Sequence, residues 1–323
     1  MKRIVLSLIG AVIAACAWPR AASASPYPER PIRVIVPTTA GSVPDVVARA
    51  VGEQLATLLG QPVVMENRPG AGGAIGLNAV SKSPADGYTL GVLSLPYVVA
   101  ADLLPQRPFD IERDLLPVAM MNWNYAILVV RADAPFRTVD DLVSAARKHP
   151  GQIKYSSQGN GTPGHLAIKL LEQQTGTGFV HVPYKGGPAA VTALLAGEVD
   201  VHAGGLAALG QQIATHALRP LATLAPERLA ALPDVPTMRE LGYQSAELSD
   251  WQGLVAPSGT PPEVVAQLAS AVAKAVAMPE LRNRLESLGM KPAGLGPDVF
   301  GSIVRDELVR WKRVVRDAHI KVD

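Results

Sequence analysis

Short apolar segments alternate with amphipathic ones along the chain from residue 32 onward. The short runs, rich in β-branched residues, predict strands at Ile32–Val36, Val63–Glu66, Thr89–Leu93, Ala126–Val130, Ile153–Ser157, Phe179–Tyr184, Val199–His202, Leu218–Leu224 and Gly253–Ala256. Between the first two runs, apolar residues recur at helical spacing within Asp45–Leu59. Strands that alternate with helices predict largely parallel sheets with helices on both faces.

Two helix starts are marked by local chemistry. Thr138 followed by Asp141 predicts a capping box, and that helix is expected to stop at His149. Thr260 is the expected N-cap of a later helix, with proline at the first helical position and Glu263 in the first turn.

Length and charge narrow the class of protein. A chain of 323 residues with 48% hydrophobic and 18% charged residues suits two globular α/β domains, with a ligand cleft expected between them. The formal net charge is only +2, and the basic residues of the last helix alternate with acidic ones. We therefore expect no nucleic-acid partner.

The first 24 residues have the features of a signal peptide. Lys2 and Arg3 precede the uncharged apolar stretch Ile4–Ala17, and Ala22-Ser23-Ala24 provides small residues at a cleavage site. The stretch is shorter than the roughly 20 residues of a membrane-spanning helix. The expected location is the periplasm.

Cys16, the one cysteine, lies inside this targeting region. Cleavage after Ala24 would leave no thiol, which excludes disulfides and thiol catalysis in the mature protein. Alternatively, Ile13-Ala14-Ala15-Cys16 resembles a lipobox, in which case Cys16 would be lipidated and would tether the protein to a membrane.

Gly159 to Gly164 form a G-x-G-x-x-G sequence between a predicted strand and a predicted helix. A dinucleotide site would also need an acid after the next strand, but that strand ends in Tyr184-Lys185-Gly186-Gly187. Pro163 also removes one N–H that would face a pyrophosphate. The remaining interpretation is an anion site, where glycines allow close approach and helix N-terminal amides favour negative charge. The alternative is a turn that is merely glycine-rich.

A second candidate loop, Thr38 to Asp45, joins the first strand to the first helix. Its small residues and hydroxyls beside a helix N-terminus suit a carboxylate. Alternatively, Ser42 or Asp45 acts only as an N-cap. A further glycine cluster, Gly70 to Gly76, is interpreted as a tight packing turn.

Motifs for catalysis and metal binding are absent from the sequence. It contains no G-x-S-x-G elbow, no H-E-x-x-H and no Walker loop, and its six histidines lack metal-ligand spacing. His165 is a candidate for a hydrogen bond in the pocket, because it follows the glycine loop. We therefore expect no enzyme activity, no cofactor and no metal.

Several ordered motifs resemble the extracytoplasmic solute receptors of tripartite tricarboxylate transporters, the TctC-like or Bug family. The similarity runs from about Tyr27 to the C-terminus. The matching segments are Tyr27–Pro37, Glu66–Gly73, Ala85–Leu90, Ser157–His165, His181–Gly186, Leu195–Asp200 and Ala231–Thr237.

This resemblance implies a type II periplasmic-binding-protein fold, in which two α/β domains are joined by two crossing strands near Tyr125 and Asp250. The implied domains are residues 25–124 plus 251–323, and residues 125–250. The family binds small carboxylates through loop amides, hydroxyls and bridging waters. The ligand-binding residues expected here are Thr38, Thr39, Gly41, Ser42, Asp45, Ser157, Gly159, Asn160, Gly161, Thr162, His165, Tyr184 and Gly204.

Two segments depart from the family pattern. The first loop reads Thr38-Thr39-Ala40-Gly41 where the family usually has Pro-Gly-Gly, and His202-Ala203-Gly204-Gly205 replaces a segment that often carries an acid or amide. The second departure predicts a smaller, less polar wall and a ligand bulkier than a simple dicarboxylate.

The expected function is a monomeric receptor that captures a di- or tricarboxylate, an amino acid or an aromatic carboxylate. It would deliver this ligand to the membrane components of a tripartite tricarboxylate-type transporter. A ligand-sensing subunit of a membrane signalling system is the alternative, because both functions need the same cleft.

Overall fold

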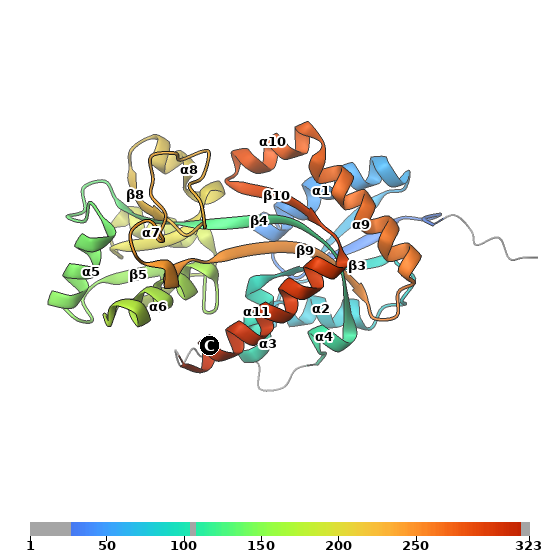
Figure 1. Ribbon diagram of the computed structural model, residues 1–323, viewed down its shortest axis with the longest axis horizontal. Coiled ribbons are helices and arrows are strands. Elements are labelled where there is room, and N and C mark those ends of the chain that lie inside the picture. Colours follow the sequence, from blue (N-terminus) through green and yellow to red (C-terminus); the bar gives the residue numbers. More distant parts are fainter. Residues whose placement is uncertain (1–26, 104–107, 318–323) are drawn as a thin grey trace, which may run out of the picture.

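The computed structural model describes residues 27–103 and 108–317, which form one continuous sheet with helices on both faces (Figure 1). The predicted signal peptide and Cys16 lie outside the described residues. The strands are β1 Ile32–Val36, β2 Val63–Asn67, β3 Thr89–Ser94, β4 Leu115–Arg131, β5 Lys154–Ser157, β6 Val180–Pro183, β7 Val201–Gly205, β8 Leu218–Thr223, β9 Ser249–Pro257 and β10 Met290–Leu295.

The helices alternate with these strands, as the sequence pattern predicts. They are α1 Val43–Leu59, α2 Ala74–Ser81, α3 Leu95–Leu103, α4 Ile111–Asp114, α5 Val139–Lys148, α6 Pro163–Thr175, α7 Gly187–Ala196, α8 Leu206–Ala214, α9 Pro262–Ala277, α10 Pro279–Ser287 and α11 Pro297–Asp317, with the 3₁₀ helices η1 Ala71–Gly73 and η2 Gln244–Ala246.

The sheet order is β2-β1-β3-β9-β4-β7-β5-β6, and β10 and β8 each pair with β4. Strands β1, β2 and β3 are parallel to one another, and so are β5, β6 and β7. We call the half built on β1–β3 lobe 1 and the half built on β5–β7 lobe 2. The parallel pairing within each lobe confirms the α/β class expected from the alternation of elements.

Two long strands connect the lobes. β4 pairs with β9 from Leu115 to Tyr125 and then with β7 from Ala126 onward. β9 starts at Ser249, opposite Tyr125. Residues 122–126 of β4 and 249–252 of β9, which we call the crossing segment, therefore lie between the lobes. This is where the family resemblance places the crossings, near Tyr125 and Asp250.

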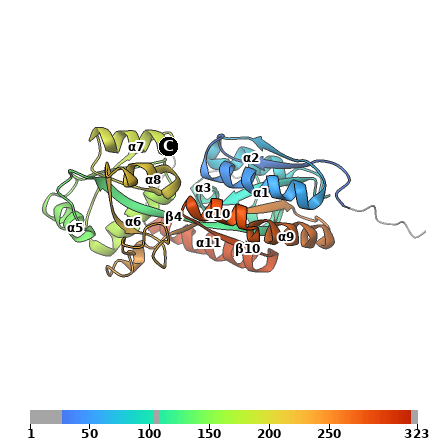
Figure 2. The ribbon, with the colours of Figure 1, turned by 90° about the horizontal axis from the view of Figure 1, so that it is seen from above.

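The carboxyl ends of the parallel strands point at this segment from both sides. In lobe 1, β3 runs antiparallel to β9, so that its last residue, Ser94, lies opposite Gln252. In lobe 2, β7 runs antiparallel to β4, so that its last residue, Gly205, lies opposite Ala126. Viewed from above in Figure 2, α7 and α8 lie on one side of the crossing, and α1, α2 and α3 lie on the other. Loops that follow parallel strands in the two lobes therefore face each other.

The core alternates across β4 with a period of two residues. Ala126, Leu128 and Val130 pack in the cluster that contains α5 and α6 side chains. Ile127 and Val129 pack in the cluster with α7 and α8. Because apolar residues occupy both faces, the strand reads as a continuous hydrophobic run and was easily predicted from Ala126 onward.

Two local predictions were wrong. β4 begins at Leu115 rather than at Ala126, because polar Asn122 and Asn124 interrupt its apolar pattern. Thr260 is not an N-cap: Pro261 occupies that position, and the Thr260 hydroxyl donates to the Pro257 carbonyl at 2.8 Å instead.

The predicted capping box of α5 is confirmed, with Thr138 accepting from the Asp141 N–H and Asp141 accepting from the Thr138 N–H. Thr138→Ala is expected to lower the free energy of unfolding by about 1 kcal/mol, because one helix N–H loses its partner. Urea denaturation measures this change. Thr57→Ala, at an exposed position inside α1, is the control and should change stability by less than about 0.5 kcal/mol. Equal effects of the two substitutions would contradict a specific role of the cap.

Candidate functional site

Asp45 organises the loop between β1 and α1. Its carboxylate accepts from the Gly41 N–H at 2.9 Å, from the Asn67 amide at 2.8 Å and from Arg49 Nε at 3.0 Å. Burial alone would raise the pKa of Asp45, but the hydrogen bonds from Arg49, Gly41 and Asn67 outweigh it and lower the pKa. The carboxylate is thus ionised and occupied by its own loop. An anionic ligand would be held by the neighbouring N–H and hydroxyl groups.

Ser42 occupies the N-cap position of α1, but its side chain makes no cap hydrogen bond. Its Oγ is buried and has no hydrogen-bond partner among the described residues. Thr39 and Gly41 are exposed on the same loop, and Gly41 has φ +80°, a conformation that favours glycine. The first loop therefore offers a hydroxyl and exposed backbone at a helix N-terminus.

The loop between β5 and α6 is also fixed by its own hydrogen bonds. Ser157 Oγ is buried and lies 3.1 Å from the Gly159 nitrogen, from which it accepts. The Thr162 hydroxyl donates to the Gly159 carbonyl at 2.7 Å. Gly159 and Gly161 have φ of +129° and +72°, so the loop requires glycine at both positions. Asn160 lies between them with a half-exposed side chain.

His165 supports this loop from inside. It is 4% exposed, and its Nδ1 accepts from the Gly161 N–H at 3.0 Å. Its ring stacks on His181 with centroids 4.1 Å apart, and His181 in turn stacks on Tyr155. Burial, with the nearby His181 and Lys169, lowers the pKa of His165 to about 3. The imidazole is therefore neutral at pH 7 and positions Gly161.

Three helix N-termini in lobe 2 follow the carboxyl ends of the parallel strands. The N-caps of α6, α7 and α8 are Thr162, Gly186 and Gly205, and none of them caps its helix through a side chain. The first backbone N–H groups of such helices have no partner within the helix and carry partial positive charge. Together with α1 of lobe 1, they form a candidate site for an anion such as a carboxylate.

Two of the predicted site residues, Tyr184 and Gly204, lie outside the two loops. The Tyr184 hydroxyl donates to Glu198 at 3.0 Å, beyond the C-terminal end of α7. Only its backbone meets the glycine loop, because the Tyr184 N–H donates to the Ser157 carbonyl at 3.0 Å. A Cβ on Gly204 would lie 2.6 Å from His202 Nε2 and 3.2 Å from Gln158 Nε2. His202 and Gln158 thus occupy the space that a side chain at position 204 would need. His202 is neutral at pH 7, because burial lowers its pKa to about 4.

A polar cluster on the crossing segment was missed by the sequence analysis. Asn124 and Asp250 lie opposite each other in the β4–β9 pair, and their side chains are hydrogen-bonded at 3.4 Å. Asn122 donates to Gln252 at 2.7 Å, and Gln252 donates to Asp250 at 3.0 Å. A signal existed in the sequence, because Asn-Trp-Asn and Asp-Trp-Gln each place polar residues on alternate positions of an apolar stretch.

Contacts link this cluster to the first loop of lobe 1 and to the N-terminus of α8 in lobe 2. Asn124 Oδ1 lies 3.4 Å from where a Cβ on Gly205 would stand, at the N-cap of α8. On the other side, the Tyr97 hydroxyl of α3 lies beside Thr38 and within electrostatic reach of Asp250. The glycine cluster at residues 72–73 allows this packing, because a Cβ on Gly73 would lie 2.4 Å from the Tyr97 ring. The packing role expected for that cluster is confirmed.

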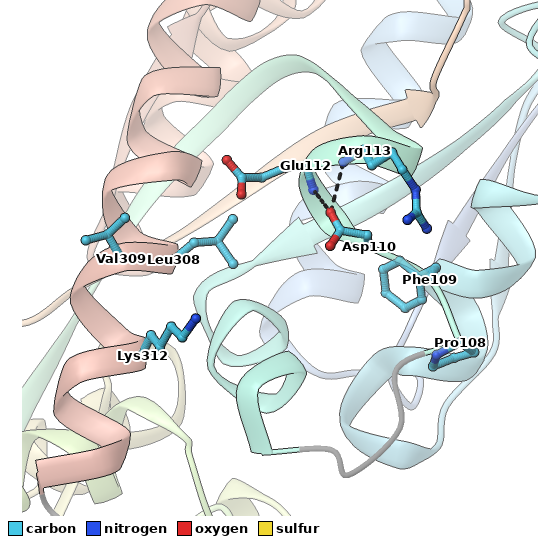
Figure 3. Close-up of a pocket in the computed structure, with 8 residues that line it drawn as sticks. All are labelled: Pro108, Phe109, Asp110, Glu112, Arg113, Leu308, Val309 and Lys312. Atoms are coloured by element: carbon cyan, nitrogen blue, oxygen red, sulfur yellow. Dashed lines mark hydrogen bonds between the residues drawn. The ribbon is translucent and has the colours of Figure 1, made fainter.

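Two cavities lie apart from the two loops. Figure 3 shows one of about 550 Å³ between α4 and α11, with Asp110 and Arg113 on one side and Lys312 on the other. It adjoins the start of β4 at Leu115, roughly 30 Å of extended strand from Tyr125. A smaller cavity of about 220 Å³ borders Tyr125 and residues 289–291. The larger one is too distant to belong to the candidate site.

Among residues 27–103 and 108–317, no group of three or more His, Cys, Asp or Glu side chains is arranged to hold a metal ion. Within the same ranges, no single helix has the length and apolar composition to cross a membrane. In these ranges, α9 and α10 reach that length and composition only when taken together, and the chain bends by 70° between them.

Comparison with known proteins gives consistent matches over nearly the whole chain. The family model described as the tripartite tricarboxylate transporter family receptor matches residues 47–320. Protein BugT of Bordetella pertussis is 36% identical over 320 residues, covering 98% of each chain.

Solved structures of similar proteins superpose closely. The periplasmic binding protein BugD matches with a TM-score of 0.81 and 29% identity over 92% of this chain and 100% of its own. Rpa4515 of R. palustris, solved with adipate, matches with a TM-score of 0.83 and 32% identity over 92% of this chain and 100% of its own. MatC of Rhodopseudomonas palustris, solved with bound malate, matches with a TM-score of 0.79 and 31% identity over 90% of this chain and 100% of its own.

Proposed function

Because the chain belongs to the tripartite tricarboxylate transporter receptor family, with the fold of its periplasmic binding proteins, we propose that it is a periplasmic receptor without enzyme activity. It captures a small carboxylate between its lobes and delivers it to the membrane components of a transporter. Its relatives are solute-binding proteins, and the solved ones include complexes with adipate and with malate. Export by a cleaved signal peptide of residues 1–24 is part of this proposal.

The observation that carries the proposal is the pair of uncharged loops that face each other across the crossing segment. Neither residues 38–44 nor residues 157–164 contain a lysine or arginine, so a carboxylate would be bound by N–H and hydroxyl groups. Helix N-termini of both lobes supply these donors. The expected ligand contacts are the backbone and hydroxyls of residues 38–42 together with residues 159–162.

Capture is coupled to movement about the crossing segment. Since a ligand that touches both loops makes its full set of contacts only when the lobes are close, binding favours the closed arrangement. The division into residues 25–124 plus 251–323 and residues 125–250 corresponds to the two bodies that would move. The membrane components would recognise the closed form.

The size of the ligand is set in part by residues 202–205. The neutral His202 and Gln158 side chains occupy the space beside Gly204, and no charged group projects there from Gly204 or Gly205. The wall is therefore uncharged, but it is filled and does not by itself provide room for a ligand bulkier than a simple dicarboxylate. The candidates are a di- or tricarboxylate, an amino acid or an aromatic carboxylate.

A thermal-shift panel of these carboxylates tests the proposal. A ligand at 100 times its dissociation constant is expected to stabilise the folded protein by about 2.7 kcal/mol, which corresponds to a rise in Tm of roughly 5 °C. Thr39→Glu, which adds a negative charge to the exposed first loop, should abolish the shift. Thr57→Glu adds the same charge at an exposed position inside α1 and should leave the shift unchanged. A folded protein that responds to no carboxylate, or a shift that survives Thr39→Glu, would contradict the proposed function.

A further inference from the structure

Asp250 carries a buried carboxyl group without a positive partner. None of the ion pairs found among residues 27–103 and 108–317 includes it, and the titratable group near it is Tyr97. An ionised carboxylate in a buried position is costly unless a cation or several hydrogen bonds compensate. Among the described residues, Asp250 therefore has hydrogen-bond donors around it but no cation to balance its charge.

The hydrogen bonds around Asp250 are all of one kind. Its Oδ1 accepts from the Trp251 N–H at 2.8 Å, and its Oδ2 accepts from the Gln252 and Asn124 amides at 3.0 and 3.4 Å. The Leu95 N–H also faces the carboxyl group. The two backbone groups remain donors whichever way the side-chain amides are turned. The surroundings thus donate hydrogen bonds to the oxygens of an ionised carboxylate.

The group also reaches the surface at the crossing segment. Asp250 is 6% exposed, and Asn124 and Tyr97 are each 8% exposed, whereas Asn122 and Gln252 are fully buried at 0%. The other two partly exposed groups lie toward the lobes, Tyr97 beside Thr38 and Asn124 beside Gly205. Asp250 lies between them on the crossing segment, and we take this segment as the floor of the space that a captured ligand would enter.

We propose that Asp250 selects ligands that carry a protonated amine beside their carboxylate, so that the solute is a zwitterion of the amino-acid type. This inference rests on the proposed function and specifies its ligand class. The helix N-termini bind the carboxylate of the ligand, and Asp250 binds its ammonium group. The opposite ends of the site thereby complement the opposite charges of one small molecule.

The chemistry of the site explains why a plain dicarboxylate is disfavoured. A second carboxylate at the floor would meet the negative charge of Asp250 at short range in a poorly solvated position, which costs free energy. An ammonium group removes that repulsion and supplies the missing cation. Hydrogen bonds to charged groups contribute about 1.5–3 kcal/mol, so a preference on the order of 10- to 100-fold is expected.

Matched pairs of ligands test the inference by titration calorimetry at pH 8. The pairs differ only by an amine: succinate with L- and D-aspartate, glutarate with L- and D-glutamate, and 3-phenylpropionate with L- and D-phenylalanine. In the wild type, the amino member of the binding pair should bind at least 10-fold tighter. In Asp250→Asn this ratio should fall to about threefold or less. Asp133→Asn, which removes an exposed carboxylate in lobe 2, should retain the wild-type ratio.

The outcomes separate this inference from the function on which it rests. Tight binding of a plain carboxylate with no gain from the amine overturns the role of Asp250 and leaves the receptor function intact. A ratio that survives in Asp250→Asn also overturns it. If the folded wild type binds no member of any pair but binds another carboxylate of the thermal-shift panel, the inference is contradicted and the receptor function stands; if it binds no carboxylate at all, both are contradicted. The wild-type comparison alone is decisive should Asp250→Asn fail to fold.

Discussion

Gly164→Ala is expected to lower the free energy of unfolding by about 2–3 kcal/mol and to weaken ligand binding more than 10-fold. A Cβ on Gly164 would lie 2.3 Å from the carbonyl oxygen of Ala203, a backbone atom of β7 that cannot rotate away. The strain must be relieved by moving the N-terminus of α6 away from β7, and overpacking of this kind typically costs about 1–3 kcal/mol. Because that N-terminus carries the glycine loop, the displacement also misplaces the amides that would hold the carboxylate.

Gly210→Ala is the matched control. Gly210 lies inside α8, and its added Cβ would be 3.6 Å from the nearest atom, a side-chain carbon of Leu206. This substitution should stabilise the protein by about 0.5–1 kcal/mol, because alanine favours a helix interior over glycine. Urea denaturation and calorimetry with the best ligand of the panel measure both effects. If Gly164→Ala matches Gly210→Ala in stability, the close contact of α6 with β7 is not needed.

The central elements of the fold could be predicted from sequence where burial is uniform. Ile32–Val36 was predicted with the bounds that β1 has, because both faces of this strand are covered and every residue but Arg33 is buried. β10 was missed, since Lys291, Pro292 and Gly294 interrupt its apolar pattern. The crossing part of β4 was missed for a related reason: its polar residues are paired with polar residues of β9, and no local pattern records that pairing.

The candidate site was predicted in its backbone and not in its side chains. Glycines and helix starts are local features, so the loops before α1 and α6 were found from sequence. The roles of Asp45 and His165 depend on which donors fold back onto them, and both groups bind their own loops. Asp250 could not be found in this way, because its partner Asn124 lies 126 residues away in the chain.

As the pH rises from about 4 to about 7, the difference in the free energy of unfolding between Asp250→Asn and the wild type is expected to shift in favour of the variant. The shift is up to about 4 kcal/mol, because only the wild type loses stability over this range. Burial raises the pKa of Asp250 from 3.8 to about 7, against the opposing hydrogen bonds from Trp251, Asn124, Gln252 and Leu95. Between these two values the folded state retains a proton that the unfolded state has released. The free energy of unfolding of the wild type therefore falls by about 1.4 kcal/mol per pH unit through this window and levels off above pH 7.

Urea denaturation of both proteins at pH 4, 5.5, 7 and 8 measures the difference. Asp45, whose pKa is lowered, contributes stability that is lost on the acid side, but this loss is common to both proteins and cancels. Asp133→Asn, at a carboxylate that is 76% exposed, is the control for removing a surface carboxylate. A difference between Asp250→Asn and the wild type that is constant from pH 4 to pH 8 would show that Asp250 has the same pKa in the folded and unfolded states.

The two properties of Asp250 arise from one cause and should change together. An uncompensated carboxylate at the crossing segment destabilises the unliganded fold near neutral pH, and a ligand ammonium would supply the charge that compensates it. Ligand-induced stabilisation of the wild type by an amino acid should therefore be larger at pH 8 than at pH 5.5, where Asp250 is protonated. The stability of Asp250→Asn should not fall between pH 4 and pH 7 as that of the wild type does, and the variant should be less selective for the amine. A variant that escapes this fall but retains the preference for the amine would separate the two properties and would confine Asp250 to a structural role.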